Sequence, residues 1–173
     1  SSAAKLLSDA KFPVILNGAG VILGNAIPAS QALAERLDSP VCCNYQHNDA
    51  FPGSHPLFVG PLGYNGSKAA MELIKQADVV FALGTRLNPF STLPGYNLDY
   101  WPNEAKLIQV DINPDRIGLT KPVTVGIVGD SKKVAEQILS RLTDSAGDAG
   151  RDVRRKLIAD KKAVWAKTLA SMD

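Results

Sequence analysis

The chain has 173 residues, of which 45% are hydrophobic, and a formal net charge of +2. This length and composition suit one domain with one core, and the small charge argues against a dedicated nucleic-acid-binding protein. No signal peptide, lipidation motif or apolar run of 18 residues occurs, so we expect a cytoplasmic protein without membrane attachment. The two cysteines, Cys42 and Cys43, would point to opposite faces of a strand, so we expect free thiols.

The first half of the chain predicts two strands, a helix between them and a long loop. Proline is tolerated in a first helical turn, which favours a helix that begins near Pro28. The loop is long enough to be functional or to face a partner. In order, the expected elements are a helix (3–10), a strand (12–16) closed by Asn17-Gly18-Ala19-Gly20, a helix (28–37), a strand (41–45) and the loop (46–66).

The strand at 79–83 is the best defined element of the second half. Asp78 and Gly84 bracket five apolar residues, which is typical of a strand buried on both faces in a parallel sheet. A loop over 87–103 follows, and we assign none of its aromatic residues to the core: Phe90, Tyr96, Tyr100 and Trp101. The other expected elements are a helix capped by Ser67, strands at 107–111 and 124–128, a helix that begins at Asp130 or Ser131, and a last helix over 152–172.

Strands that alternate with helices predict an α/β fold with a doubly wound, mainly parallel sheet and right-handed crossovers. We expect a five- to six-stranded Rossmann-like sheet in a three-layer α/β/α arrangement. In such sheets ligands lie beyond the carboxyl ends of the strands.

Four predicted strands end in glycine or an acid, and all four ends lie on one edge of the sheet. Glycines there let a phosphate approach the backbone, Arg86 offers a planar fork of donors, and a carboxylate such as Asp111 can accept hydrogen bonds from ribose. The alternative is that the fold needs tight turns at this edge without any ligand. The candidate residues at these ends are Gly18, Gly20, Gly84, Arg86, Asp111 and Asp130.

More specific chemistry fits poorly. The NAD fingerprint lacks its third glycine, because Leu23 stands at that position, and no acid follows the second strand. His47 and His55 have no standard zinc spacing with the cysteines, so hydrogen-bonded structural histidines are favoured. No nucleophile elbow, Walker loop or HExxH motif occurs. We expect neither catalytic nor metal-binding residues in this chain.

The last helix is basic, with seven Lys or Arg and three Asp or Glu over residues 151–173. No nucleic-acid-binding motif frames these basic residues, so we predict a solvated face and not a nucleic-acid site. Its apolar residues would then need cover from a neighbouring domain or subunit. They are Val153, Leu157, Val164, Trp165 and Leu169.

Over residues 1–143 the chain resembles the central domain of thiamine-diphosphate-dependent enzymes of the acetolactate synthase family. The resemblance is carried by Pro13-Val14-Ile15-Leu16-Asn17-Gly18-Ala19-Gly20, Pro40-Val41, the loop from His55 to Gly66, Ala77 to Arg86, Gln109-Val110-Asp111-Ile112-Asn113 and Gly129-Asp130. It implies a middle domain between two catalytic ones, which binds FAD or ADP in some members and is structural in others. The nucleotide contacts of the family carry over to Gly18, Gly20, Gly63, Gly66, Gly84, Arg86, Asp111 and Asp130.

Within that family, three segments look most like the sulfoacetaldehyde acetyltransferases: Asn44 to Pro52, Gly60 to Tyr64 and Asp99 to Pro102. The resemblance implies an enzyme that converts sulfoacetaldehyde and phosphate to acetyl phosphate and sulfite with thiamine diphosphate and magnesium, as a homodimer or homotetramer. An acetolactate synthase-like carboligase or decarboxylase, or a stand-alone FAD- or NAD-binding redox domain, is the alternative.

The chain departs from the whole enzyme, because the family's Gly-Asp-Gly motif and its later asparagine have no counterpart here. Gly129-Asp130 is followed by Ser131, and no asparagine follows Asn113. Since the chain also starts at Ser1, we expect a piece of a longer polypeptide that is inactive alone. Residues 144–173 would form a linker and a helix that lead to a missing catalytic domain.

Overall fold

A computed structural model that describes residues 1–173 shows a six-stranded sheet in which every neighbouring pair is parallel. The strand order is β3-β2-β1-β4-β5-β6, so β1 and β4 lie at the centre. This confirms the predicted doubly wound sheet. The strands are β1 (Pro13–Asn17), β2 (Val41–Cys43), β3 (Phe58–Pro61), β4 (Val79–Leu83), β5 (Lys106–Asp111) and β6 (Val125–Val128).

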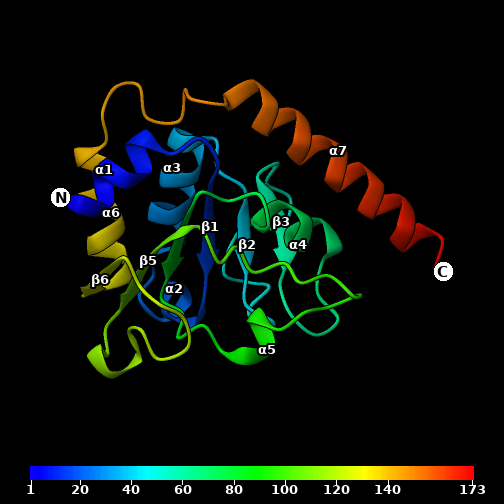
Figure 1. The fold of residues 1–173 in the computed structure, drawn as a ribbon, viewed down its shortest axis with the longest axis horizontal. Helices are drawn as coiled ribbons and strands as arrows, with labels where there is room; N and C mark the ends of the chain where they lie inside the picture. The colour runs from blue at the N-terminus through cyan, green and yellow to red at the C-terminus, as the bar shows by residue number, and fades with distance from the viewer.

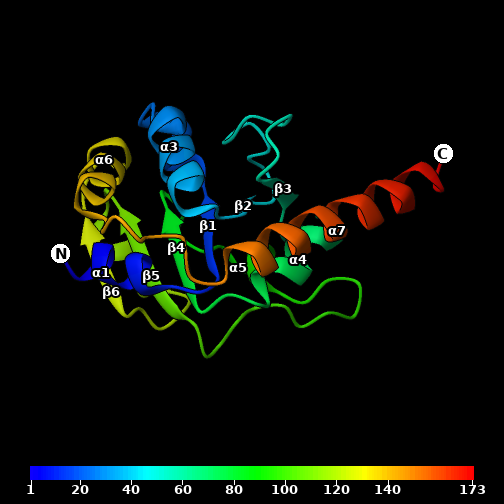
Figure 2. The same cartoon turned by 90° about the horizontal axis from the view of Figure 1, so that it is seen from above.

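Helices cover both faces of the sheet and give the three-layer arrangement (Figures 1 and 2). On one face α3 packs against α6, and on the other α4 packs against α7. No helix is both long and apolar enough to cross a membrane. The helices are α1 (Ser2–Asp9), α2 (Ala19–Leu23), α3 (Ile27–Leu37), α4 (Lys68–Ile74), α5 (Pro89–Thr92), η1 (Pro114–Arg116), α6 (Ser131–Arg141) and α7 (Arg151–Ala170).

Two of these helices begin directly after capping residues that the sequence predicts. The Ser67 hydroxyl accepts a hydrogen bond from the Ala70 amide, and the Asp130 carboxylate accepts one from the Lys133 amide. Each bond satisfies a backbone donor that has no partner inside its helix. Asp130 and not Ser131 is therefore the cap of α6.

Strand β4 has the predicted bounds, and all five of its residues are buried. Strand β3 was missed, because Gly60 and Pro61 in the loop 46–66 argue against a strand. Proline is tolerated there because β3 is the edge strand of the sheet. Strand β2 also stops at Cys43, two residues short of the prediction. Both cysteines are buried free thiols, as expected.

The loop that contains Tyr100 and Trp101 contributes to the core, so the prediction for these two residues is wrong. Tyr100 is fully buried and Trp101 is 8% exposed. The Tyr100 hydroxyl donates to the Ser91 carbonyl at 3.0 Å, which lets a polar ring tip enter the core. Burial raises the pKa of Tyr100 to about 12. Phe90, by contrast, is exposed as expected.

Helix α7 differs from its prediction in which residues face the domain. Val153 and Val164 are exposed, whereas Ile158 and the charged Arg154 are buried. The predicted solvated basic face is therefore wrong at Arg154. Several other basic residues of the helix also contact the domain: Arg151 and Arg155 pair with Asp38, Lys161 pairs with Glu72, and Lys162 donates to the carbonyls of His55 and Pro56.

Candidate functional site

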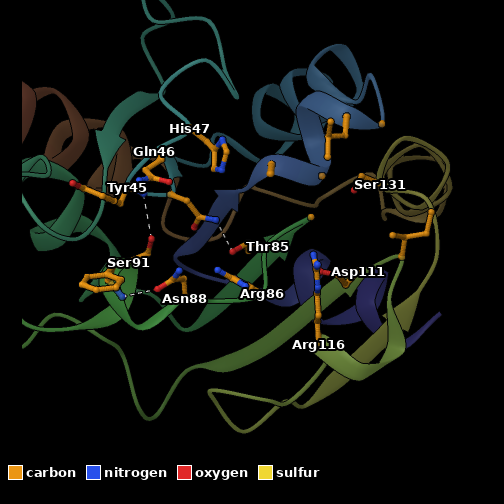
Figure 3. A pocket seen from close by; sticks show the side chains of 18 of the residues that line it. Tyr45, Gln46, His47, Thr85, Arg86, Asn88, Ser91, Asp111, Arg116 and Ser131 are labelled. Carbon is orange, nitrogen blue, oxygen red and sulfur yellow. Dashed lines mark hydrogen bonds between the residues drawn. The ribbon is translucent and has the colours of Figure 1, made fainter.

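A cavity of about 910 Å³ lies at the carboxyl edge of the sheet, where the ligand site was predicted. Figure 3 shows Tyr45, Gln46 and His47 on one side of it, Asp111 and Arg116 on the other, and Arg86 between them. Its walls come from residues at the carboxyl ends of all six strands, including Tyr64 after β3. The cavity thus combines residues that are distant in sequence.

Two glycine turns form the floor where β1 and β4 end. The Gly20 amide donates to the Gly84 carbonyl at 2.9 Å. Gly84 has a φ of +63°, and a Cβ there would lie 2.7 Å from Gly20 Cα. Both the left-handed conformation and the close approach therefore require glycine at position 84. This explains why the sequence has glycine directly after its best-defined strand.

The charged groups of the cavity are of both signs. Arg86 and Arg116 are exposed, and neither guanidinium makes a hydrogen bond or an ion pair within the chain. Asp111 is only 4% exposed, and its Oδ1 accepts a hydrogen bond from the Asn113 amide at 2.9 Å. Two guanidinium groups without protein partners, together with a carboxylate fixed by a backbone hydrogen bond, can bind an anionic ligand that also carries hydroxyl donors.

A polar pair, Asn44 and Thr85, closes the turn after β4. Asn44 Nδ2 donates to Thr85 Oγ1 at 2.7 Å, and the same oxygen accepts from the Leu87 amide at 3.0 Å. The Asn44 Oδ1 atom is buried and has no hydrogen-bond partner in the protein. Asn44 lines the cavity, but this oxygen is enclosed by protein, so a ligand donor could pair with it only if the amide group turned.

Aromatic side chains form the wall nearest β2. The rings of Tyr45 and Tyr64 meet edge to face, with centroids 6.2 Å apart. Tyr64 and Phe90 are exposed at 67% and 63%. The Tyr45 amide donates to Ser91 Oγ at 3.2 Å, which ties this wall to α5. Exposed rings at a cavity mouth offer a stacking surface for a planar group.

The structure brings five of the eight predicted site residues to the cavity: Gly20, Gly84, Arg86, Asp111 and Asp130. Gly18, Gly63 and Gly66 are not among the lining residues. Instead, the Cα hydrogens of these glycines face backbone atoms. A Cβ on Gly18 would lie 2.5 Å from the Gly84 carbonyl oxygen, and a Cβ on Gly63 would overlap the Phe90 carbonyl oxygen. These three glycines therefore shape the turns around the cavity.

Sequence reasoning missed the polar and aromatic walls. The residues it did not assign to a site include Asn44, Tyr45, Gln46, His47, Asn88, Phe90, Ser91 and Arg116. The signal that was available is position, because Asn44 to His47 directly follow β2 and Asn88 to Ser91 lie just after the turn of β4. Neither segment contains a glycine or an acid, the residue types that mark the other strand ends.

The two histidines have different surroundings. His55 Nε2 lies 2.9 Å from Glu35 Oε1, and its Nδ1 accepts from the Leu57 amide at 3.1 Å, so His55 is the predicted hydrogen-bonded structural histidine. His47 lines the cavity. No three His, Cys, Asp or Glu side chains come together in a group that could hold a metal ion.

Fold and site together define a Rossmann-like α/β domain with a large polar cavity at the carboxyl edge of its sheet. Residues 1–138 match the family described as thiamine pyrophosphate enzyme, central domain. The chain belongs to this family, as the resemblance predicted.

The chain is also similar to full-length relatives of two kinds. It is 75% identical over 99% of its length to a sulfoacetaldehyde acetyltransferase from Roseovarius nubinhibens, and 71% identical over 100% to a probable sulfoacetaldehyde acetyltransferase from Rhizobium meliloti. A probable acetolactate synthase large subunit from Methanocaldococcus jannaschii is 39% identical over 81% of the chain. The chain spans 28%, 29% and 23% of the length of these relatives.

Proposed function

We propose that this chain is the central, non-catalytic domain of a thiamine-diphosphate-dependent sulfoacetaldehyde acetyltransferase. The observation that supports this is the difference in identity, 75% to one such enzyme against 39% to an acetolactate synthase relative. The former match also covers 99% of the chain, including most of α7. The complete enzyme would convert sulfoacetaldehyde and phosphate to acetyl phosphate and sulfite.

The residues of this chain do not fit thiamine diphosphate with magnesium. Asp130, the acid of the Gly129-Asp130 pair, caps α6 and has serine after it, and the chain holds no metal-binding group of His, Cys, Asp or Glu. The proposal therefore assigns both cofactors to flanking catalytic domains of the same polypeptide. It places the domain boundary near residue 143, with α7 leading to the next domain, in a cytoplasmic homodimer or homotetramer.

The complete polypeptide tests this proposal. With sulfoacetaldehyde, phosphate, thiamine diphosphate and magnesium, we expect equal amounts of acetyl phosphate and sulfite, and no product from the 173-residue chain alone. Formation of acetolactate from pyruvate in place of these products would favour the acetolactate synthase alternative. Turnover by the isolated chain would refute its non-catalytic role.

A second proposal concerns the cavity, which we infer binds a nucleotide diphosphate. The unpaired guanidinium groups of Arg86 and Arg116 and the partly satisfied Asp111 carboxylate support it. In this arrangement Arg86 contacts the diphosphate and Asp111 accepts from ribose hydroxyls. The ligand would brace the domain without taking part in the reaction.

Calorimetric titration with ADP, FAD, CoA and NAD identifies the nucleotide. Visible flavin absorbance in the purified protein would favour FAD, and reduction of that flavin by substrate would favour the redox-domain alternative. If none of the four nucleotides binds at millimolar concentration, the cavity is a structural feature of the fold and the nucleotide proposal fails.

A further inference from the structure

We propose that Arg154 is a positioning residue that fixes where α7 leaves the domain, as the centre of a polar clasp between α7 and the end of α3. The arginine clasp comprises Arg36, Asp38, Arg151, Arg154 and Arg155, together with the connection 143–150. Its role in the enzyme rests on the function proposed above. The attachment of α7 itself does not depend on that function.

Arg154 has an unusual environment for a charged residue, because its side chain is fully buried and has no carboxylate within hydrogen-bond distance. All five of its N–H groups have a partner, and every partner is a backbone carbonyl. Nε donates to Asp38 at 2.8 Å, Nη1 to Lys11 at 2.6 Å and Ala149 at 2.9 Å, and Nη2 to Leu37 at 2.8 Å and Gly147 at 2.7 Å.

The acceptors come from three segments that lie apart in the sequence. Leu37 and Asp38 are the end of α3, where carbonyls lack helical partners and the helix dipole is negative. Lys11 precedes β1, and Gly147 belongs to the connection before α7. One guanidinium thus caps α3 and joins the central strand to the start of α7.

The clasp is reciprocal. From α3, Arg36 donates to the carbonyls of Ala146 and Thr143 at 2.6 Å and of Asp144 at 2.8 Å. From α7, Arg151 and Arg155 each pair with an oxygen of Asp38 at 2.8 Å. The Asp38 carboxylate therefore offsets part of the positive charge around Arg154. Burial lowers the pKa of Arg154, and Asp38 opposes that shift.

Apolar contacts along this segment are limited to a few side chains, among them Leu157, which is partly buried and packs against the core. Ala146 and Ile158 are its buried apolar side chains, whereas Val153, Val164 and Leu169 are exposed. Further along α7, the Lys161–Glu72 ion pair and the Trp165 ring, which meets Tyr96 edge to face, set its direction across α4. The end of α7 then projects beyond the rest of the domain (Figures 1 and 2).

These contacts make the start of α7 a fixed point whose loss should release the segment without unfolding the sheet. If Arg154 is replaced by an apolar residue, five carbonyls lose a donor, and of these only Gly147 keeps another, from Arg151 Nε at 3.2 Å. The other four regain partners most readily when the connection opens to water. No residue of the arginine clasp lies in a strand of the sheet. In the proposed enzyme, release would let the domain that follows α7 move relative to this one.

The test compares Arg154→Met with Lys156→Met in the complete polypeptide. Both changes remove one positive charge from α7 and introduce the same side chain, but Lys156 is exposed and makes no hydrogen bond or ion pair. For Arg154→Met we expect amide hydrogen exchange over 144–158 to become about tenfold faster or more, with β1, β4 and β5 unchanged. Lys156→Met should change neither. Arg154→Lys should be intermediate, since an ammonium has three donors for five carbonyls.

A kinetic measurement separates positioning from attachment. In the proposed reaction, Arg154→Met should lower kcat and leave KM for sulfoacetaldehyde unchanged, because catalytic domains lose their relative placement. Unchanged exchange over 144–158, or equally faster exchange in the central strands, would overturn the clasp. Faster exchange with an unchanged kcat would overturn its positioning role. If the wild-type polypeptide has no such activity, the proposed function fails and the exchange result still decides the attachment.

Discussion

The substitution Gly84→Ala tests whether the close approach of the β1 and β4 turns is as tight as the structure shows. The φ of +63° would place an alanine in the left-handed region, which costs about 1–2 kcal/mol. Its Cβ would lie 2.7 Å from Gly20 Cα and 2.8 Å from the Val21 amide nitrogen, both backbone atoms that cannot rotate away. Overpacking of this kind costs about 1–3 kcal/mol more. We therefore expect the free energy of unfolding to fall by about 2–5 kcal/mol.

Urea unfolding followed by circular dichroism measures this change, and a thermal scan should show a Tm lower by about 5–15 °C. Gly53→Ala is the matched control, because a Cβ at that position has no neighbour within 4 Å. It should alter the free energy of unfolding by less than about 0.5 kcal/mol. A loss below about 1 kcal/mol for Gly84→Ala would refute the reasoning, since the two turns would then be able to move apart.

Three further predictions concern the cavity, the start of β1 and a buried thiol. Arg86→Gln should weaken ADP binding about tenfold in calorimetry, because a charge-assisted contact becomes neutral. Asp78→Ala should lower the free energy of unfolding by about 1–3 kcal/mol in urea, because Asp78 accepts from the amides of Lys11 and Phe12 at 2.8 and 2.9 Å. Burial raises the pKa of Cys43 from 9.0 to about 12, so the free energy of unfolding should decrease between these pH values as the unfolded chain loses the thiol proton first. Cys43→Ala should make that decrease smaller.

Each of these predictions has an outcome that contradicts it. Equal ADP affinity in Arg86→Gln and the wild type would remove Arg86 from the site. A stability change below about 0.5 kcal/mol for Asp78→Ala would mean that water replaces the carboxylate without cost. An identical pH dependence of stability in Cys43→Ala and the wild type between pH 9 and 12 would show that other groups account for the whole decrease.

The central strands could be predicted because their signal is local. Five apolar residues between Asp78 and Gly84 define β4 without any knowledge of its neighbours, and the structure confirms both bounds. Strand β3 has no such signal, since Gly60 and Pro61 are strand breakers and only the position at the sheet edge makes them acceptable. Tyr100 is a similar case: its burial depends on a hydrogen bond to the Ser91 carbonyl, a partner that no periodicity reveals.

The cavity was predictable in place but not in composition. Parallel strands bring their carboxyl ends together, so Gly20, Gly84, Arg86 and Asp111 could be assigned to one edge from strand order alone. The aromatic wall depends on how two loops fold back, and Tyr45 meets Tyr64 only because β3 returns the chain beside β2. Arg116 reaches the cavity from a turn after β5 that carries no glycine signal.

Arg154 shows why a charge pattern on a helix does not by itself identify the exposed face. A residue with five donors and no acceptor is expected in water, and burial without a carboxylate partner would ordinarily cost several kcal/mol. Here the end of α3 and two other segments supply five carbonyls that also need donors, so the hydrogen bonds offset part of the cost of burying both groups. Three of these acceptors, the carbonyls of Lys11, Leu37 and Asp38, are more than a hundred residues from Arg154 in the sequence. Only the fold brings Arg154 to the end of α3, and it does so at the point from which α7 leaves the domain.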